Sequence, residues 1–196
     1  WSLKTERYQW WKPMKTIRIE LPAYHEKQKI IAESPKYHRI NIAACAVKWG
    51  KTLGCCKWLF QEAIENDGFK CVWGAPTYRQ SLIAFDHIRK FIPAQFIGSQ
   101  FSINKTIMRI EFLFNGSFID FFSLDKPYNI EGNAYHRFVL DEAAKMRQEG
   151  FASVMTTLTQ TRGRGWIIST PLGKNWFYHK YLIGRSNVPD YSSYNF

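Results

Sequence analysis

The stretch INIAACAVKWGKT occupies residues 40–52 and decides the fold of this 196-residue chain. Residues 40–46 form an almost continuous apolar run, which predicts a strand covered on both faces, as in a parallel sheet. After Gly50, apolar side chains recur at helical spacing until Asp67-Gly68 ends the pattern. The stretch therefore predicts a buried strand that turns directly into a helix.

Outside this stretch, strands and helices alternate along the chain. The remaining predicted elements are a helix over residues 24–32 that stops before Pro35, a strand over 71–73, a helix between Thr77 and Pro93, a strand over 138–140, a helix over 151–158 and a last core strand over 166–170. Between Ile107 and Phe122, two β-branched and aromatic runs flank Asn115-Gly116, which predicts a hairpin. The pattern indicates an α/β fold with a mostly parallel central sheet flanked by helices, and one inserted β-hairpin.

The triplet Gly50-Lys51-Thr52 stands where the buried strand turns into the helix. Backbone N–H groups and the helix dipole favour a phosphate at such a place. In a P-loop, the Lys neutralises the β- and γ-phosphates and the Thr hydroxyl binds Mg²⁺. The first glycine of the usual G-x-x-x-x-G-K-[ST] pattern would fall at Cys45, so the loop departs from the common form. A surface turn with a solvated lysine is the alternative interpretation of the triplet.

A second set of candidate residues follows the predicted strand over residues 138–140. Asp141 would enter the Mg²⁺ shell, and Glu142 would orient and deprotonate an attacking water. The alternative is that the two acids only cap the next helix. Further on, Ser169 and Thr170 end the last predicted core strand, where their hydroxyls could sense a γ-phosphate and couple its loss to motion.

The composition narrows the classes of partner. A net charge of +11 points to a polyanion, either nucleic acid or an anionic membrane surface. No apolar run approaches the roughly 18 residues of a membrane span, which argues against a membrane-spanning protein. The four cysteines lack metal-site spacing and are interpreted as small buried residues. The chain starts with Trp1 rather than Met, so we expect a piece of a longer polypeptide.

Taken in order, the motifs resemble those of the ATPase domain of large terminase subunits, the motors that package DNA into the heads of tailed phages and related viruses. The matching segments are residues 21–28, 50–52, 75–80, 115–117, 139–144 and 169–178. The resemblance implies a RecA-like (ASCE) P-loop NTPase fold, ATP and Mg²⁺ as cofactors, and adenine recognition by Gln28. Terminases usually carry an arginine in the phosphate loop, where this chain has Val47, so Lys48 is expected to take that role.

The resemblance also implies partners. They are double-stranded DNA, a portal protein and a small terminase subunit, with assembly into a homo-oligomeric ring in the cytoplasm of the infected host cell and no membrane association. Such a ring implies an arginine finger from a neighbouring subunit. Arg109 is the first candidate, on a hairpin expected to protrude from the sheet, and Arg79 and Arg137 are the others. The family also often has an arginine before Gly-Asn ahead of the acidic strand, where this chain has Glu131.

Three parts are expected along the chain. Residues 1–35 form an N-terminal arm and adenine-reading segment, residues 36–183 the P-loop ATPase core, and residues 184–196 the start of a linker to a C-terminal nuclease domain that the chain lacks. Two other functions stay open from the residues alone. One is a single RecA-like domain of a helicase, and the other is a non-enzymatic, basic DNA-binding module with a degenerate nucleotide site.

Overall fold

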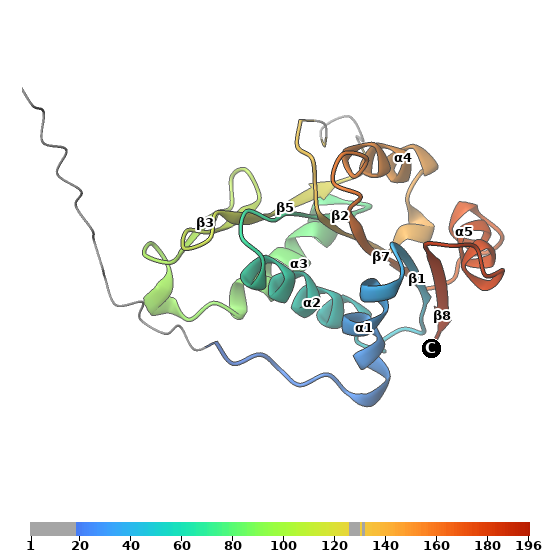
Figure 1. The fold of residues 1–196 in the computed structure, drawn as a ribbon, viewed down its shortest axis with the longest axis horizontal. Helices are drawn as coiled ribbons and strands as arrows, with labels where there is room; N and C mark the ends of the chain where they lie inside the picture. The colour runs from blue at the N-terminus through green and yellow to red at the C-terminus, as the bar shows by residue number, and fades with distance from the viewer. Residues whose placement is uncertain (1–18, 126–129, 131) are drawn as a thin grey trace, which may run out of the picture.

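A computed structural model describes residues 19–125, 130 and 132–196, so residues 1–18 of the expected arm and Glu131 lie outside the described part (Figure 1). The α-helices are α1 (Lys29–Tyr37), α2 (Lys51–Glu65), α3 (Tyr78–Lys90), α4 (Gln148–Thr157) and α5 (Trp176–Arg185). The strands are β1 (Ile40–Ala44), β2 (Lys70–Ala75), β3 (Phe101–Asn104), β4 (Arg109–Phe112), β5 (Ser117–Ser123), β6 (Arg137–Asp141), β7 (Arg164–Ser169) and β8 (Tyr191–Asn195). Short 3₁₀ helices are η1 (Glu26–Gln28), η2 (Ala94–Phe96) and η4 (Ala143–Lys145).

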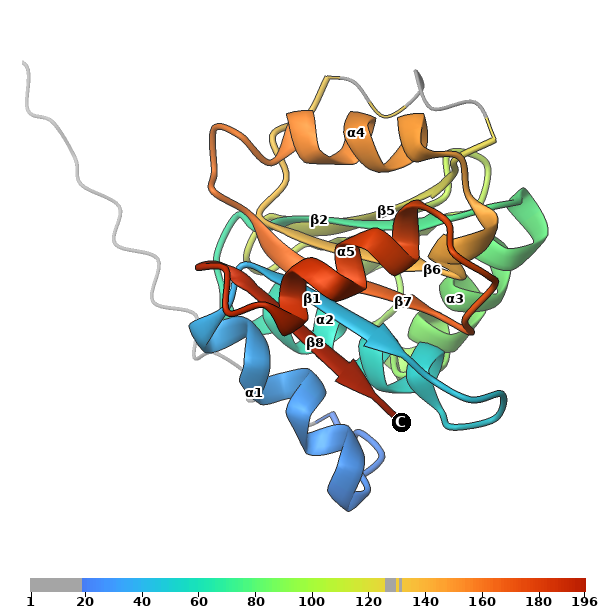
Figure 2. The ribbon, with the colours of Figure 1, turned by 90° about the vertical axis from the view of Figure 1, so that its right-hand side faces the viewer.

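The eight strands form one sheet in the order β3-β4-β5-β2-β6-β7-β1-β8. Neighbouring strands from β5 to β8 run parallel, and only β4 is antiparallel to its neighbours β3 and β5. Figure 2 shows β1, β7 and β8 pointing toward the same edge. The predicted α/β fold with a mostly parallel sheet is therefore confirmed.

The two faces of the sheet are buried by different helices (Figure 1). Along β1, Ala43 belongs to one buried cluster, whereas Ile42 and Ala44 belong to the other. The first cluster includes apolar residues of α1, α2 and α3, and the second includes those of α4 and α5. Burial on both faces explains why the central strands are near-continuous apolar runs.

The prediction that the first helix stops before Pro35 is wrong. Helix α1 runs to Tyr37 with Pro35 inside it. Because Pro has no N–H, it cannot donate to the carbonyl four residues earlier, at Ile31. The indole N–H of Trp166 on β7 donates to the Ile31 oxygen at 3.0 Å instead. The tertiary contact satisfies the carbonyl that the proline leaves free.

The predicted hairpin at Asn115-Gly116 is present, as β4 and β5, but it does not protrude. Both strands are hydrogen-bonded into the sheet, with β5 next to β2, and a strand that we did not predict, β3, forms the outer edge. The apolar side chains of these strands explain the difference, since Phe101, Ile110 and Phe112 are fully buried. The inserted segment therefore extends the sheet.

The expected linker over residues 184–196 also needs correction. Its residues 191–195 form β8, which pairs in parallel with β1, so β7 is not the last strand. Buried hydroxyls hold β8 in place, because Ser192 donates to Asn41 at 2.7 Å and lies 3.1 Å from Ser34. In the described part of the chain, the structure has no helix long and apolar enough to cross a membrane.

Candidate active site

The candidate site lies at the carboxyl edge of the sheet, where β1 leads into α2. Two residues of the connecting loop have left-handed backbone conformations, Lys48 with φ 65° and Gly50 with φ 87°. Left-handed residues next to right-handed ones direct successive backbone N–H groups to one point and so form an anion-binding concavity, called a nest. The left-handed φ at residue 50 favours glycine, and a Cβ there would lie 2.6 Å from the Nε2 atom of Gln28 and displace that amide. The loop is shaped for a phosphate despite Cys45 at its first position.

Lys51 and Glu142 meet across this edge, where the Lys51 Nζ lies 3.1 Å from Oε1 of Glu142. A second cation, Lys145 Nζ, lies 2.9 Å from Oε2 of Glu142. Burial acts to raise the pKa of Glu142, but Lys145 and Lys51 outweigh it and hold that pKa below its usual value. Glu142 is therefore a carboxylate at neutral pH. Lys145 was not among the predicted site residues, although its position three residues after Glu142 is a signal for an ion pair.

Thr52 and Asp141 form the adjoining part of the site. The Thr52 hydroxyl donates to Oδ2 of Asp141 at 2.9 Å, and the N–H of Glu142 donates to Oδ1 at 2.9 Å. Burial raises the pKa of Asp141 to about 6, and the Thr52 hydrogen bond opposes the shift. A hydroxyl and a buried carboxylate side by side are hard oxygen donors of the kind that Mg²⁺ prefers, so these residues fit the ion.

Ser169, at the end of β7, touches both halves of the site. Its hydroxyl accepts from the N–H of Ala144 at 3.1 Å and donates to the carbonyl of Thr170 at 2.9 Å. Its own carbonyl accepts from the N–H of Cys45 at 3.0 Å. Ser169 thus links the start of the phosphate loop to the turn that follows Glu142. Thr170 is half-buried beside it.

Gln28 is buried against the phosphate loop. Its Nε2 donates to the carbonyl of Gly50 at 3.0 Å, and its Oε1 accepts from the N–H of His25 at 3.3 Å. Both ends of the amide are therefore engaged within the chain, and adenine recognition by Gln28 stays a prediction. Lys48 is exposed on the same loop, and its role in place of an arginine also stays a prediction.

The three candidate finger arginines lie in different places. Arg109 on β4 makes two hydrogen bonds to Asp120 on the neighbouring strand β5, at 2.6 and 2.9 Å, so its guanidinium is already paired within the same chain. Arg137 donates to Glu62 at 2.7 Å and stands at the start of β6, the opposite end from Asp141. Arg79 is exposed in the first turn of α3, which follows the carboxyl end of β2. Of the three, Arg79 alone combines exposure with the edge that carries the candidate site.

An aromatic stack that we did not predict supports the phosphate loop. The rings of Trp49 and Phe196 are stacked, with centroids 4.5 Å apart, and the ring of His25 meets Trp49 edge-on at 5.4 Å. The backbone of Phe196 also bonds to both sides of the loop start, donating to Ala44 at 3.0 Å and accepting from Ala46 at 2.8 Å. The sequence feature that could have indicated this stack is a tryptophan, Trp49, directly before Gly50.

Known proteins resemble this chain in sequence and in fold. A curated large terminase subunit of Thermus phage G20c is 40% identical over 63 residues, which are 32% of this chain and 13% of that protein. The large terminase ATPase domain of Thermus phage P74-26 superposes with a TM-score of 0.78 at 23% identity, covering 88% of this chain and 80% of the other. The large terminase of the thermophilic bacteriophage D6E, solved in complex with ADP, gives a TM-score of 0.71 at 14% identity, covering 89% and 45%.

The matched segment spans only a small part of the curated relative, but a family comparison covers much more of this chain. Residues 42–185 match the N-terminal part of the terminase large subunit of the T4-like-virus type. This range includes the phosphate loop, the acidic strand end and Ser169. The chain belongs to the family of terminase large subunits.

Proposed function

We propose that this chain is the Mg²⁺-dependent ATPase of a motor that moves double-stranded DNA into a viral procapsid. The observation that carries the proposal is the convergence of Lys51, Thr52, Asp141 and Glu142 at one sheet edge, over a loop shaped for a phosphate. Family membership supports the same conclusion, and the relative of phage D6E was solved with ADP.

The residues divide the chemistry between them. The loop N–H groups and the Lys51 ammonium would bind the β- and γ-phosphates. Thr52 and Asp141 would hold Mg²⁺, which supplies charge neutralisation on the phosphates when bound. Glu142 would orient a water in line with the γ-phosphate and accept its proton, and its lowered pKa keeps it ionised for that task.

The ion pair between Lys51 and Glu142 gives the site an order of events. Phosphate oxygens compete with Glu142 for the Lys51 ammonium, because both are anionic ligands of the same cation. Binding of the nucleotide would therefore free Glu142 from Lys51. Lys145 would stay on Oε2, so the oxygen that becomes available to water after the nucleotide binds is Oε1 of Glu142.

Coupling to motion would run through Ser169 and Thr170. Ser169 contacts Cys45 before the phosphate loop and Ala144 after the catalytic base. If loss of the γ-phosphate moved the phosphate loop or the turn after Glu142, Ser169 would pass that movement to the other segment. Double-stranded DNA, a portal protein, a small terminase subunit and neighbouring copies in a ring are the proposed partners, in the cytoplasm of the infected cell.

The test is ATP hydrolysis by this chain and by the longer polypeptide, with and without Mg²⁺ and duplex DNA. We expect Mg²⁺-dependent hydrolysis that duplex DNA accelerates, with Lys51→Ala losing nucleotide affinity. Nucleotide binding without hydrolysis in either form would favour a non-enzymatic DNA-binding module. Separation of the strands of a duplex would favour a helicase.

A further inference from the structure

The amino edge of the sheet, opposite the candidate active site, carries a row of cations. One row of the sheet register holds three arginines. Arg137 of β6 pairs with Arg164 of β7. Because Ile40 of β1 pairs with Gly165, the preceding residue, Arg39, lies level with Arg164. Neighbouring strands are about 4.8 Å apart, so the row spans about 10 Å. Strands β6 and β7 thus begin with an arginine, and Arg39 directly precedes β1 at the same level.

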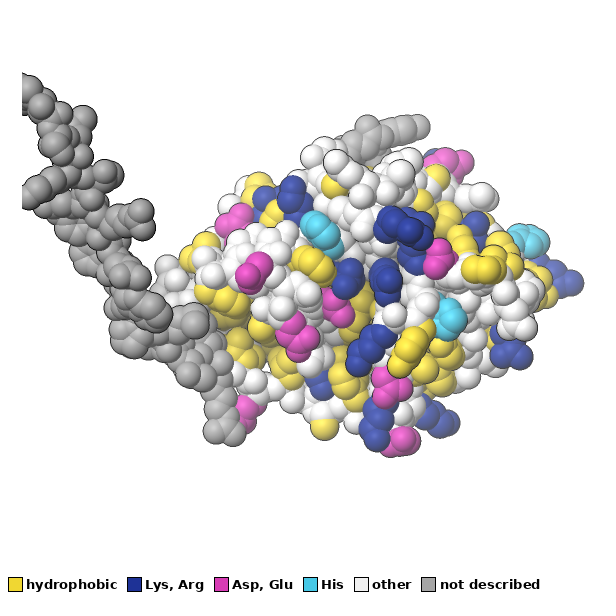
Figure 3. Space-filling view, viewed as in Figure 1, with side chains coloured by type: hydrophobic (Ala, Val, Ile, Leu, Met, Phe, Trp, Pro, Cys, Tyr) yellow, Lys and Arg dark blue, Asp and Glu magenta, His cyan; other side chains and the backbone are white. Residues whose placement is uncertain are grey.

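Further basic residues surround this row. We define the basic edge as Lys36, Arg39, Lys70, Arg137, Arg162 and Arg164. Lys36, Arg162 and Arg164 are exposed, and the other three are half-buried. Figure 3 shows Lys and Arg side chains gathered near the middle of one face of the molecule. The basic edge is a concentrated part of the net charge of +11.

Most of this charge is not neutralised by neighbouring acids. Arg39 donates to the carbonyl of Gly163 at 3.1 Å, and Arg164 donates to those of Pro35 and Lys36 at 3.1 and 2.9 Å. Within the described residues, the ion pairs of the structure join only one member of the basic edge, Arg137, to an acid. Backbone carbonyls orient the arginines and leave their charge available.

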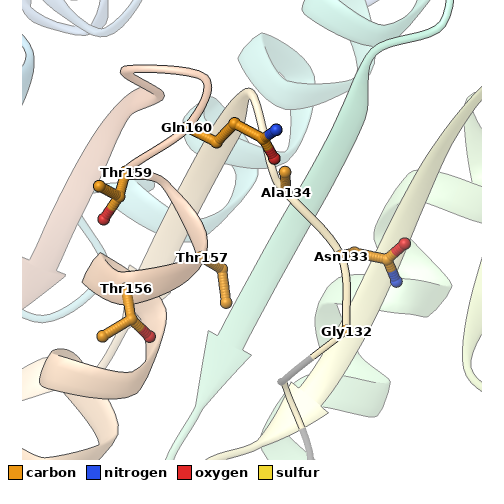
Figure 4. Close-up of a pocket in the computed structure, with 7 residues that line it drawn as sticks. All are labelled: Gly132, Asn133, Ala134, Thr156, Thr157, Thr159 and Gln160. Carbon is orange, nitrogen blue, oxygen red and sulfur yellow. The ribbon is translucent and has the colours of Figure 1, made fainter.

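A hollow of about 460 Å³ lies at the same edge (Figure 4). It is lined by Gly132, Asn133, Ala134, Thr156, Thr157, Thr159 and Gln160. Arg162 lies two residues after Gln160 in the same loop. The hydroxyls of Thr156, Thr157 and Thr159 donate to backbone carbonyls of α4, so the side-chain amides of Asn133 and Gln160 are the donors that the hollow adds to the basic edge.

We propose that the basic edge and this hollow contact the phosphate backbone of duplex DNA. The inference deepens the proposed function and rests on it. Arg and Lys side chains, together with the amides of Asn and Gln, are groups that bind DNA phosphates, and such contacts carry no sequence information. That is what a motor needs, because it must move over any sequence.

The position of this surface connects it to hydrolysis. Strand β1 follows Arg39 and ends beside the phosphate loop. Strand β6 runs from Arg137 to Asp141, and strand β7 runs from Arg164 to Ser169. The same three rigid strands therefore join the proposed DNA contacts to the candidate active site. On this proposal, a displacement at the DNA-contacting ends of the strands would be transmitted to the candidate active site.

The test uses the full chain with Lys36→Gln, Arg162→Asn and Arg164→Gln combined. A matched control removes three exposed cations elsewhere, by Lys105→Gln, Lys174→Gln and Arg185→Gln. Binding to a fluorescent duplex is measured by anisotropy over a range of salt concentrations. We expect the basic-edge variant to lose about tenfold or more in affinity and to lower the salt slope by about 2–3, because each phosphate contact contributes about 0.9 to the slope.

Hydrolysis without DNA should stay at the wild-type rate in the basic-edge variant, while stimulation by DNA is reduced. Arg162→Asn alone, at an exposed residue, serves as the second variant if the triple variant fails to fold. Equal losses of affinity in the basic-edge and control variants would overturn the proposed surface and leave the proposed function standing. Absence of DNA-stimulated hydrolysis in the wild type would instead overturn the proposed function. Unchanged DNA affinity with lost binding to an acidic protein would assign the surface to a protein partner.

Discussion

The ammonium of Lys51 lies 3.1 Å from the carboxylate of Glu142, and this contact joins the first residue of α2 to the residue after β6. Both side chains are largely buried, at 10% and 18% exposure. The pair therefore holds the proposed phosphate ligand and the proposed base together in a site from which much of the solvent is excluded.

Replacing Glu142 by Gln keeps the shape of the side chain but removes the base. We expect hydrolysis to fall by at least about 10²-fold, because general-base catalysis contributes that much or more, while MgATP still binds. The measurement is phosphate release together with nucleotide binding by calorimetry. Glu149→Gln, at an exposed position of α4, is the matched control and should keep the wild-type rate. Wild-type turnover in Glu142→Gln would reject the assignment.

The stack of Trp49 on Phe196 predicts that β8 helps to position the phosphate loop. We expect Trp49→Ala and Phe196→Ala each to weaken ATP binding several-fold, since an aromatic pair contributes about 0.5–1.5 kcal/mol. Trp49→Phe should keep most of the affinity. Phe114→Ala, at an exposed aromatic residue on the turn after β4, is the control. Unchanged affinity in Phe196→Ala would show that the loop is positioned without β8.

Gln28 gives a prediction that separates two roles of one amide. If Gln28 reads adenine, Gln28→Ala lowers the ratio of ATP to GTP affinity, because the amide donates to and accepts from the adenine edge. We expect this ratio to fall, together with some loss of affinity for both nucleotides, since Gln28 also bonds to Gly50. The two dissociation constants are measured by competition. If the affinities for ATP and GTP fell by the same factor, Gln28 would only position the phosphate loop through its hydrogen bond to Gly50.

The sequence predicts the elements around the site well, because those elements are buried on both faces and carry strong apolar patterns. Strand β1 and the loop to Lys51 are the best example. By contrast, β8 has the polar sequence Tyr-Ser-Ser-Tyr-Asn, and its place depends on hydrogen bonds of Ser192 to Asn41, from a distant part of the chain. The ion pair between Arg109 and Asp120 depends in the same way on the register between β4 and β5, which the sequence pattern within each strand does not determine.

His136 predicts a pH dependence of stability. Burial, followed by Arg137 and Lys70, lowers the pKa of His136 below its usual value. Its neutral ring accepts from the N–H of Lys70 at 3.1 Å. Since the unfolded chain then binds the proton more tightly, the contribution of His136 to the free energy of unfolding is fully present above about pH 6.5 and falls as the pH drops through the lower folded pKa. Urea unfolding from pH 7 to pH 5 measures this loss.

His136→Asn is the comparison for this measurement, because asparagine offers an acceptor that does not titrate in this range. We expect the variant to lose less stability than the wild type over the same pH interval. Parallel curves for the two proteins would show that His136 does not contribute to the pH dependence.

The last prediction separates Arg109 from Arg79 as the arginine that acts on a neighbouring subunit. Arg109 pairs with Asp120, which is 3% exposed and also accepts from the Tyr135 hydroxyl at 2.7 Å. Arg109→Ala leaves that carboxylate buried without its cation, so we expect it to destabilise the fold by about 3 kcal/mol. Arg79→Ala, at an exposed residue, should leave the melting temperature unchanged.

An exposed arginine at the edge that carries the active site is free to reach another subunit, whereas Arg109 must first leave a buried partner. We therefore expect Arg79→Ala to lower hydrolysis in assembled rings by orders of magnitude, as the loss of an arginine finger does in related phosphate enzymes, with nucleotide binding retained. Mixing Arg79→Ala chains with Glu142→Gln chains places an intact arginine beside an intact base at some interfaces. Hydrolysis should recover in the mixture, in proportion to the share of such interfaces. A mixture that assembles but stays as inactive as its parents would show that Arg79 does not act across the interface.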